Sequence, residues 1–223
     1  LASYAFETER FGKHTLSAST FFTDTSVLSN SVITKRGRTS VEDGGPGNTE
    51  ALESFAIAID GGDFPETLFG NTFPGESPVK GLTYQLAFVS QAAGDGSNSR
   101  ENGVVASVAH QFPIGKIVSL EPLVEFAYFM DADGVDGQDR YYATAGATAL
   151  IHENWNVALS YTRRETMPSG GADIGDNLVQ VSAGYAFDFG VGVDLGWRYA
   201  EEDDVESQTV GLLLTYCLNC PDE

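Results

Sequence analysis

The stretch VGVDLGWRYAEE, from Val191 to Glu202, decides the fold class. Its odd positions carry Val191, Val193, Leu195, Trp197 and Tyr199, whereas its even positions include Gly192, Asp194, Gly196, Arg198 and Glu202. Successive side chains of a β-strand point to opposite faces, so one face of this segment is apolar and the other is polar. A helix would spread both classes around its circumference. The pattern predicts a β-strand that meets a different environment on each side.

The same alternation recurs along most of the chain. It is clear in NWNVALSYTR (154–163), NLVQVSAGYAFDF (177–189) and QTVGLLLTYCL (208–218). About eleven such segments can be drawn, and helical periodicity is hard to find between them. They lie at roughly 1–12, 13–26, 52–61, 82–92, 103–112, 117–131, 140–152, 154–165, 177–188, 190–202 and 207–219. The sequence therefore predicts an all-β protein.

The connections between these segments alternate in length. Short turns are expected near residues 11–13, 113–116, 152–154 and 189–190, and longer polar connections at 27–51, 92–102, 132–139, 166–176 and 203–206. The segment 62–81 is long where a short turn is expected. An antiparallel transmembrane barrel with short turns at one rim and long loops at the other has this signature, and aromatic residues near the strand ends match its interfacial girdles.

Composition narrows the function classes. The chain has 223 residues, with 32 acidic and 12 basic side chains and a formal net charge of −20. Such a balance argues against nucleic-acid binding, because a run of phosphates would not be neutralised. A soluble sandwich or lipocalin-like barrel would also alternate, with its apolar face turned inward. The polar faces here carry Gly, Ala, Ser, Thr and acids rather than the Lys and Glu of a soluble sheet, which favours the membrane.

The hairpins RYYATAGATALIHENWNVALSYTRR (140–164) and LVQVSAGYAFDFGVGVDLGWRYAEE (178–202), followed by TVGLLLTYCL (209–218), resemble Gram-negative outer-membrane β-barrel proteins of the porin group. The chain also looks like the C-terminal half of the siderophore-porin family. The resemblance implies an outer-membrane location in a Gram-negative bacterium and contact with membrane lipid and lipopolysaccharide. Barrels of this kind end on an aromatic residue, whereas this chain continues past Tyr216 with CLNCPDE.

Strand parity bears on domain organisation. We expect one barrel domain over residues 1–219, with about 11–12 strands, and a short tail at 220–223. Porin-like barrels keep both termini on the side of the short turns, so a first strand running toward that side implies one or more N-terminal strands that are missing from this chain or not separated in the segments above. A twelve-stranded barrel and the last part of a barrel of about sixteen strands both fit.

The polar faces supply the candidate site residues. Rings of carboxylates in a pore favour cations. The expected pore-lining residues are Glu7, Glu9, Asp60, Glu121, Glu125, Asp188, Asp194 and Glu202, with Arg164 and Arg198 as counter-charges. The alternative is that these acids pair with bases or coat a filled interior. A basic cluster of Lys35, Arg36 and Arg38 lies in the longest connection, where it could attract an anionic ligand such as a ferric chelate, bind lipopolysaccharide phosphates, or remain solvated.

Two weaker motifs complete the set. Asp131, Asp133 and Asp136 hint at calcium, but the third acid is one residue late for an EF-hand loop and Tyr142 stands where Glu is needed. Cys217 and Cys220 form a C-x-x-C without the further ligands of a zinc or haem site, so a local disulfide is expected in an oxidising compartment. No other cofactor is expected.

The sequence thus predicts a porin-like channel for passive diffusion of small hydrophilic solutes, either cation-biased or preferring ferric siderophores. The rivals are a non-conducting barrel that anchors or sheathes a partner such as an electron carrier, and a surface-recognition barrel. A homo-oligomer is compatible with each of these functions. An enzyme is not expected, since no G-x-S-x-G element is present.

Overall fold

The structure is a computed structural model, and it describes residues 1–9, 11–23, 45–49, 51–62, 64, 81–94, 99–152, 154–202 and 205–216. The strands are β1 (Ala2–Thr8), β2 (Gly12–Phe21), β3 (Ser54–Gly62), β4 (Leu82–Gln91), β5 (Glu101–His110), β6 (Phe112–Ile114), β7 (Val118–Met130), β8 (Asp139–Ile151), β9 (Trp155–Met167), β10 (Ile174–Ala186), β11 (Val191–Glu202) and β12 (Val205–Tyr216). A single 3-10 turn, η3 (Ala132–Gly134), follows β7 within the described residues. No helix in this part of the chain is long and apolar enough to cross a membrane.

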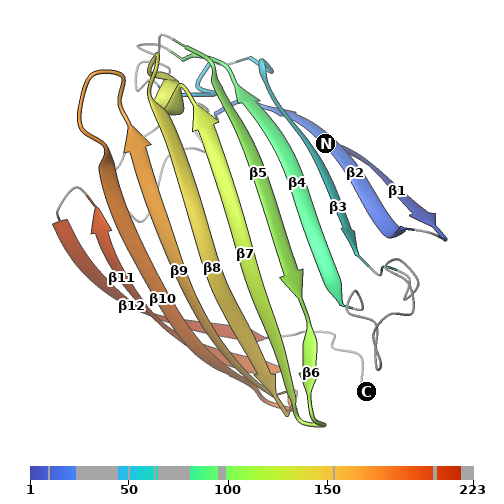
Figure 1. Cartoon of the computed structure of the whole chain (residues 1–223). Helices are drawn as coiled ribbons and strands as arrows, with labels where there is room; N and C mark the ends of the chain where they lie inside the picture. Colours follow the sequence, from blue (N-terminus) through green and yellow to red (C-terminus); the bar gives the residue numbers. More distant parts are fainter. Residues whose placement is uncertain are drawn as a thin grey trace, which may run out of the picture.

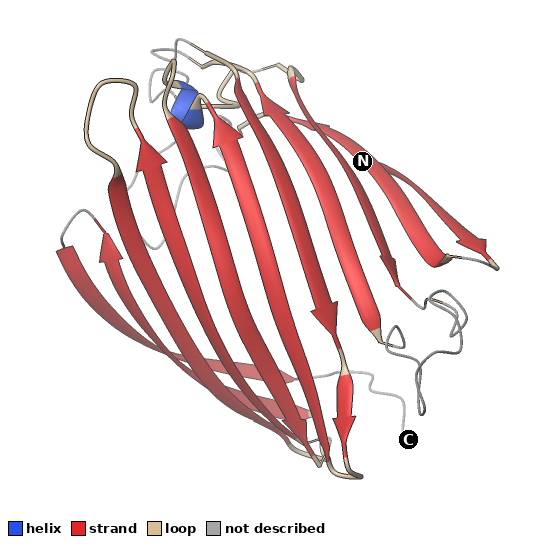
Figure 2. Ribbon diagram, in the orientation of Figure 1, coloured by secondary structure: helices blue, strands red, loops and turns tan. Residues whose placement is uncertain are grey.

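All strands belong to one antiparallel sheet of twelve strands (Figures 1 and 2). Each long strand pairs with the next in sequence, from β1 to β12, and the short β6 continues β5 along the edge of β7. The all-β prediction is therefore confirmed, and so is the expected number of strands. Within the described residues β1 and β12 are not paired with each other, so the sheet is open.

The two faces of the sheet follow the alternation in the sequence. Cross-strand register aligns Leu159, Val181, Trp197 and Val210 on one side, which we call the apolar face. The residues between them, such as Ser160, face the other side, which we call the polar face. Because side chains alternate strictly along a strand, this register carries the separation through every pair of neighbours.

The ends of the strands form two different rims. The short-turn rim holds the tight connections after β1, β6, β8 and β10, and the long-connection rim holds those after β2, β4, β7 and β9. Strands β3 and β4 also meet at the short-turn rim, but most of the segment between them lies outside the described residues. The connection expected at 203–206 is shorter than predicted, because Val205 and Glu206 already pair with β11 and only 203–204 join the strands.

Aromatic side chains cluster on the apolar face near the short-turn rim. The ring of His14 lies 5.2 Å from that of Phe6, and its Nδ1 is 3.0 Å from the hydroxyl of Tyr84. Gly61 makes this packing possible, because a Cβ there would lie 2.7 Å from a ring carbon of Tyr84. Further along the sheet, on the same face, Trp155 and Tyr185 pair 4.8 Å apart. These groups match the girdle that the sequence predicts at strand ends.

Side chains also pack closely on parts of the polar face. Gly103 lies at one such place, where there is no room for a larger residue. A Cβ at Gly103 would lie 2.5 Å from two ring carbons of Phe129 and 3.0 Å from Cγ1 of Val89. The ring of Phe129 cannot move freely, because it meets Tyr142 edge-on at 6.0 Å. Gly196, in contrast, has no atom closer than 3.9 Å to the position of its missing Cβ.

These two glycines give a matched test of the packing. We expect Gly103→Ala to destabilise the protein by about 1–3 kcal/mol, because overpacking forces neighbouring side chains to move. Gly196→Ala should be neutral or stabilising by about 0.5–1 kcal/mol, since it only removes backbone freedom. Urea unfolding followed by tryptophan fluorescence measures both, and equal midpoints for the two variants would contradict the packing described here.

Candidate functional site

The polar face gathers most of the residues predicted to line a pore. Eight of the ten predicted residues, all except Glu9 and Asp188, lie in strands at positions that face this side, as the registers of neighbouring strands show. Several have small or polar sheet neighbours: Glu121 is paired with Thr148, Glu125 with Ser107, and Asp60 with Gln85. Asp194 and Glu202, in contrast, are paired on β12 with Leu213 and Val205. Glu9 and Asp188 stand in short turns instead, so they belong to the rim.

The sheet curves toward the polar face. A hollow of about 460 Å³ is lined by residues from all six strands between β7 and β12, including Glu121, Ser160, Gln180 and Arg198. Figure 1 shows β11 and β12 turning behind the rest of the sheet, so the sheet is curved. Because polar-face residues line the hollow, that face is on the inner side of the curve. The large apolar side chains stand on the outside of this curve: Leu159 and Leu195 are both 56% exposed.

The charges on the polar face are not evenly compensated. Arg164 donates to Asp176 at 2.6 Å, and only 5% of the Asp176 side chain is exposed. Arg198 lies 3.9 Å from Glu202, at the outer limit of an ion pair. Glu121 and Glu125, and likewise Asp60, make no ion pair with another residue in the described ranges. Acidic groups therefore dominate the uncompensated charge of this face.

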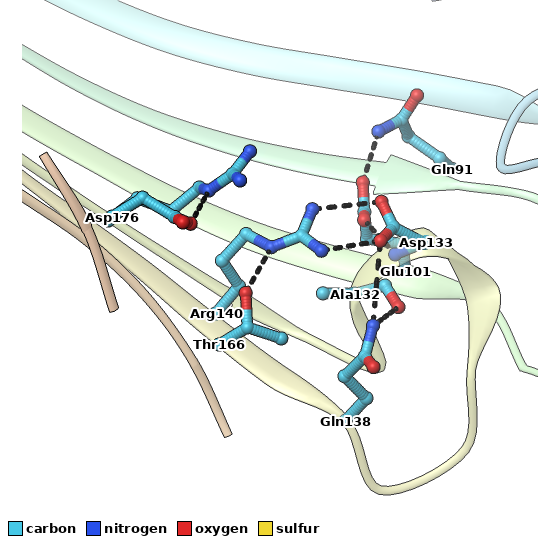
Figure 3. Close-up of polar contacts among 9 residues, drawn as sticks. Gln91, Glu101, Ala132, Asp133, Gln138, Arg140, Thr166 and Asp176 are labelled. Atoms are coloured by element: carbon cyan, nitrogen blue, oxygen red, sulfur yellow. Dashed lines mark hydrogen bonds and ion pairs between the residues drawn. The ribbon is translucent and has the colours of Figure 1, made fainter. Parts of the chain in front are cut away.

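A hydrogen-bonded network closes the polar face at the long-connection rim (Figure 3). Glu101, only 7% exposed, accepts hydrogen bonds from Gln91 and from the backbone N–H of Asp133, the latter at 2.7 Å. The carboxylate of Asp133 accepts two bonds from Arg140, at 2.9 and 2.5 Å. Arg140 also donates to Thr166 at 3.0 Å. The network joins β4, β5, β8 and β9 to the β7–β8 connection.

The backbone of that connection is shaped for this contact. Asp131 and Asp133 both have positive φ angles, 53° and 59°, in the left-handed region that non-glycine residues rarely adopt. Gln138 donates from its amide to the carbonyl of Ala132 at 3.0 Å and so stabilises the turn from within. The connection is thus held against the polar face by specific bonds on both its backbone and its side chains.

The three aspartates proposed for calcium are used separately in this arrangement. Asp131 accepts from the N–H of Gly137, Asp133 binds Arg140, and Asp136 accepts from Ser99. Among the described residues no group of three His, Cys, Asp or Glu side chains is placed to hold a metal ion. The calcium site stays a prediction, and this geometry does not bring its three residues together.

The sequence pattern does not reveal several polar residues near the long-connection rim. It places Glu101 and Asp176 in connections, because the alternation of large apolar residues starts only after them. Their parity could have identified them: Glu101 falls in step with Gly103 and Val105 on the polar face. Arg140 was recognised as a strand end but not as the partner of Asp133, which depends on how the connection folds back.

A second polar network lies on the apolar face, at the same rim. Tyr141 donates to Glu165 at 2.8 Å, and Arg163 lies 3.6 Å from Glu165 and donates to Asn177 at 3.2 Å. Asn177 in turn donates to Glu201 at 3.0 Å. Two residues further from the rim along β9, β10 and β11, the same face carries Tyr161, Val179 and Tyr199. Beyond these residues, the three strands carry only apolar and aromatic side chains on this face. We call this outer set of polar contacts the outer belt.

Two predicted sites lie outside the described residues. These are the basic cluster of Lys35, Arg36 and Arg38, and the cysteine pair Cys217 and Cys220.

Comparison with known proteins finds a likeness in structure but none in sequence. No family model matches the sequence. No curated protein matches it either. The structure is similar to the crystal structure of the outer membrane channel DcaP of Acinetobacter baumannii, with 12% sequence identity and a TM-score of 0.56. The matched region covers 96% of this chain and 61% of the DcaP chain, so this chain spans about three fifths of the length of that channel.

At this level of identity the likeness concerns the fold. The chain shares with that channel an antiparallel all-β fold, and its sheet is apolar on the outside of its curve and polar on the inside. The prediction of an antiparallel barrel-type fold of about twelve strands is therefore confirmed, whereas the outer-membrane location and the preference for siderophores stay predictions.

The rim network can be tested through Glu101. In Glu101→Gln a neutral amide with one accepting oxygen replaces a carboxylate that accepts from both Gln91 and Asp133, so the N–H of Asp133 loses its charged acceptor. A hydrogen bond to a charged group contributes about 1.5–3 kcal/mol. We expect the backbone amide of Asp133 to exchange its hydrogen at least about 10-fold faster. Hydrogen-exchange mass spectrometry of the 131–138 segment measures this. Glu125→Gln, a matched change on the same face outside the network, should leave the exchange unchanged; unaltered exchange in both variants would contradict the network.

Proposed function

We propose that this sheet is the wall of an outer-membrane channel through which small hydrophilic solutes diffuse passively. The observation that carries the proposal is the curved sheet itself, with a polar inner face and large exposed apolar side chains outside. Val124, Leu159 and Leu195 are each 56% exposed, and no described element covers them. In water this surface would be costly, at about 25 cal/mol for each Å². In a bilayer the same surface would contact lipid hydrocarbon, as the outer apolar band of a transmembrane barrel does.

The outer belt supports this placement. Its charged and amide groups contact one another: Arg163 lies near Glu165 and donates to Asn177. They lie on the apolar face at the long-connection rim, and the residues two positions closer to the middle of the strands are Tyr161 and Val179. Buried in hydrocarbon, such groups would be expensive even when paired. At the headgroup level they can contact water, lipid and lipopolysaccharide. The belt therefore marks the outer boundary of the membrane in this proposal.

The open edges of the sheet set a requirement on the working form. In hydrocarbon every backbone N–H and C=O needs a partner, so a spanning barrel cannot leave an unpaired edge. Strands β1 and β12 each have one free edge among the described residues. A working channel must therefore pair both edges, either with each other or with further strands of a larger barrel.

The charge of the inner face favours cations. Arg164 is neutralised by Asp176, whereas Glu121, Glu125 and Asp60 have no base partner among the described residues. Unpaired carboxylates raise the local concentration of cations and lower their barrier to entry. A preference for ferric siderophores would instead require the basic cluster of Lys35, Arg36 and Arg38 to reach the lumen.

The orientation of the sheet in the bilayer can be tested with neighbouring residues. Leu159→Arg places a charge on the apolar face and should destabilise the protein by about 2–4 kcal/mol if the site is near the bilayer midplane. Ser160→Arg places the same charge on the polar face and should have little effect. Urea titration of the protein folded in lipid vesicles measures both. A larger cost for Ser160→Arg would reverse the assignment of the two faces.

Conductance tests the channel itself. In planar bilayers the full protein should give stable open-channel currents, with a reversal potential in a KCl gradient that indicates cation preference. Neutralising Asp60, Glu121 and Glu125 together, as Asn, Gln and Gln, should lower the cation-to-anion permeability ratio by about twofold or more. Glu206→Gln removes an acid from the other face and should leave the ratio unchanged. Correct insertion without any current would favour the non-conducting barrel.

A further inference from the structure

Small residues line part of the hollow on the polar face, where the space beside Gly196 and Gly211 is open and Ser160 packs against Gly146. Gly146, Gly196 and Gly211 lie in it on β8, β11 and β12, and Ser160 lies between them on β9. A Cβ at Gly211 would meet no atom within 4 Å, so the space beside this backbone is open. A solute can therefore approach the sheet closely at this point, as in other sites where glycine lines a binding surface. A volume of about 460 Å³ is that of a small-molecule site.

Two opposite charges border this hollow. Among its lining residues in the described part of the chain, the charged ones are Glu121 on β7 and Arg198 on β11. Glu121 has no ion-pair partner in that part of the chain, and the nearest acid to Arg198 is Glu202 at 3.9 Å. The rest of the lining that can hydrogen bond is neutral, namely Thr148, Ser160, Gln180, Ser182 and Thr209. Neither charge is satisfied by the other.

The topology fixes the separation of the two charges. Strands β8, β9 and β10 lie between β7 and β11, so four strand spacings separate Glu121 from Arg198. At about 4.8 Å per spacing the backbones are about 19 Å apart along the curved sheet. Glu121 is level with Gly196 in the register, so Arg198 is also offset from it by two residues along the strands. This leaves on the order of 10 Å between side chains that reach in from each border. An extended chain of three residues spans about 10 Å.

We propose that this hollow binds short zwitterionic peptides of about three residues, with the ammonium group at Glu121 and the carboxylate at Arg198. Peptide N–H and C=O groups would bond to the neutral side chains along the floor. A simple cation or anion would use only one border and meet a like charge at the other. The inference rests on the proposed function, because it takes the polar face as the wall of a water-filled lumen, and it names a solute class for that lumen.

Binding in detergent tests the site without requiring any current. Isothermal titration calorimetry of the full protein would compare triglycine with N-acetyl-triglycine, which lacks the positive end, and triglycine amide, which lacks the negative end. We expect triglycine to bind at least about 10-fold more tightly than either capped form. Glu121→Gln should remove the advantage over the acetylated peptide, and Arg198→Gln the advantage over the amide. Glu206→Gln, which removes an acid from the apolar face, should change neither.

A charge exchange gives a sharper test. The double variant Glu121→Arg, Arg198→Glu keeps one charge of each sign at the borders, so triglycine can bind in the reversed direction and should regain its advantage over both capped peptides. Equal binding of the three peptides to the unaltered protein would overturn the inference. So would a double variant that is folded by circular dichroism but does not bind triglycine more tightly than the capped peptides. Currents in planar bilayers test the channel independently. Discrimination among the peptides without any current would support the peptide site and contradict the channel. Currents without discrimination among the peptides would support the channel and contradict the peptide site.

Discussion

The structure depends on one constraint, the register of cross-strand hydrogen bonds between neighbouring strands. Side chains alternate between the two faces at every residue, so a shift of one position in any pair would exchange the faces of a whole strand. The pairing of Val181 with Trp197, continued by Trp197 with Val210, keeps large apolar groups together across three strands. Everything else, including the curvature toward small polar residues and the location of the charges, follows from keeping these faces apart.

The same separation explains why the two sides of the sheet differ in how they treat charge. On the polar face charges occur singly as well as in pairs, and Glu121 and Glu125 need no partner because water solvates them in the proposed channel. On the apolar face charges lie near the long-connection rim and are bonded, as Arg163 is to Asn177. Desolvation costs account for this difference, because an unpaired charge is tolerable only where solvent reaches it.

Much of the fold could be predicted because alternation is a local property. NWNVALSYTR and VGVDLGWRYAEE each specify a strand and the orientation of its residues without knowledge of any neighbour. Less could be predicted at the strand ends. Glu101 and Asp176 continue their strands without a large apolar neighbour to reveal it, and the bonding of Asp133 to Arg140 depends on left-handed backbone angles that no periodicity encodes. The interruption between β5 and β6 at Gln111 was likewise hidden inside a single apolar stretch.

The outer belt has a consequence for the accuracy of pairing. Alternation alone rejects a slip by an odd number of positions, yet it accepts a slip by two, since the faces are then preserved. A slip of two positions would move a strand by about 7 Å along its neighbour and separate Glu165 from Tyr141, Arg163 from Asn177 and Asn177 from Glu201. These polar groups would then lie at mismatched depths in the proposed membrane. The outer belt therefore specifies the register. Among the alignments that the apolar alternation alone would permit, it favours the one in which the polar groups of neighbouring strands lie at the same height.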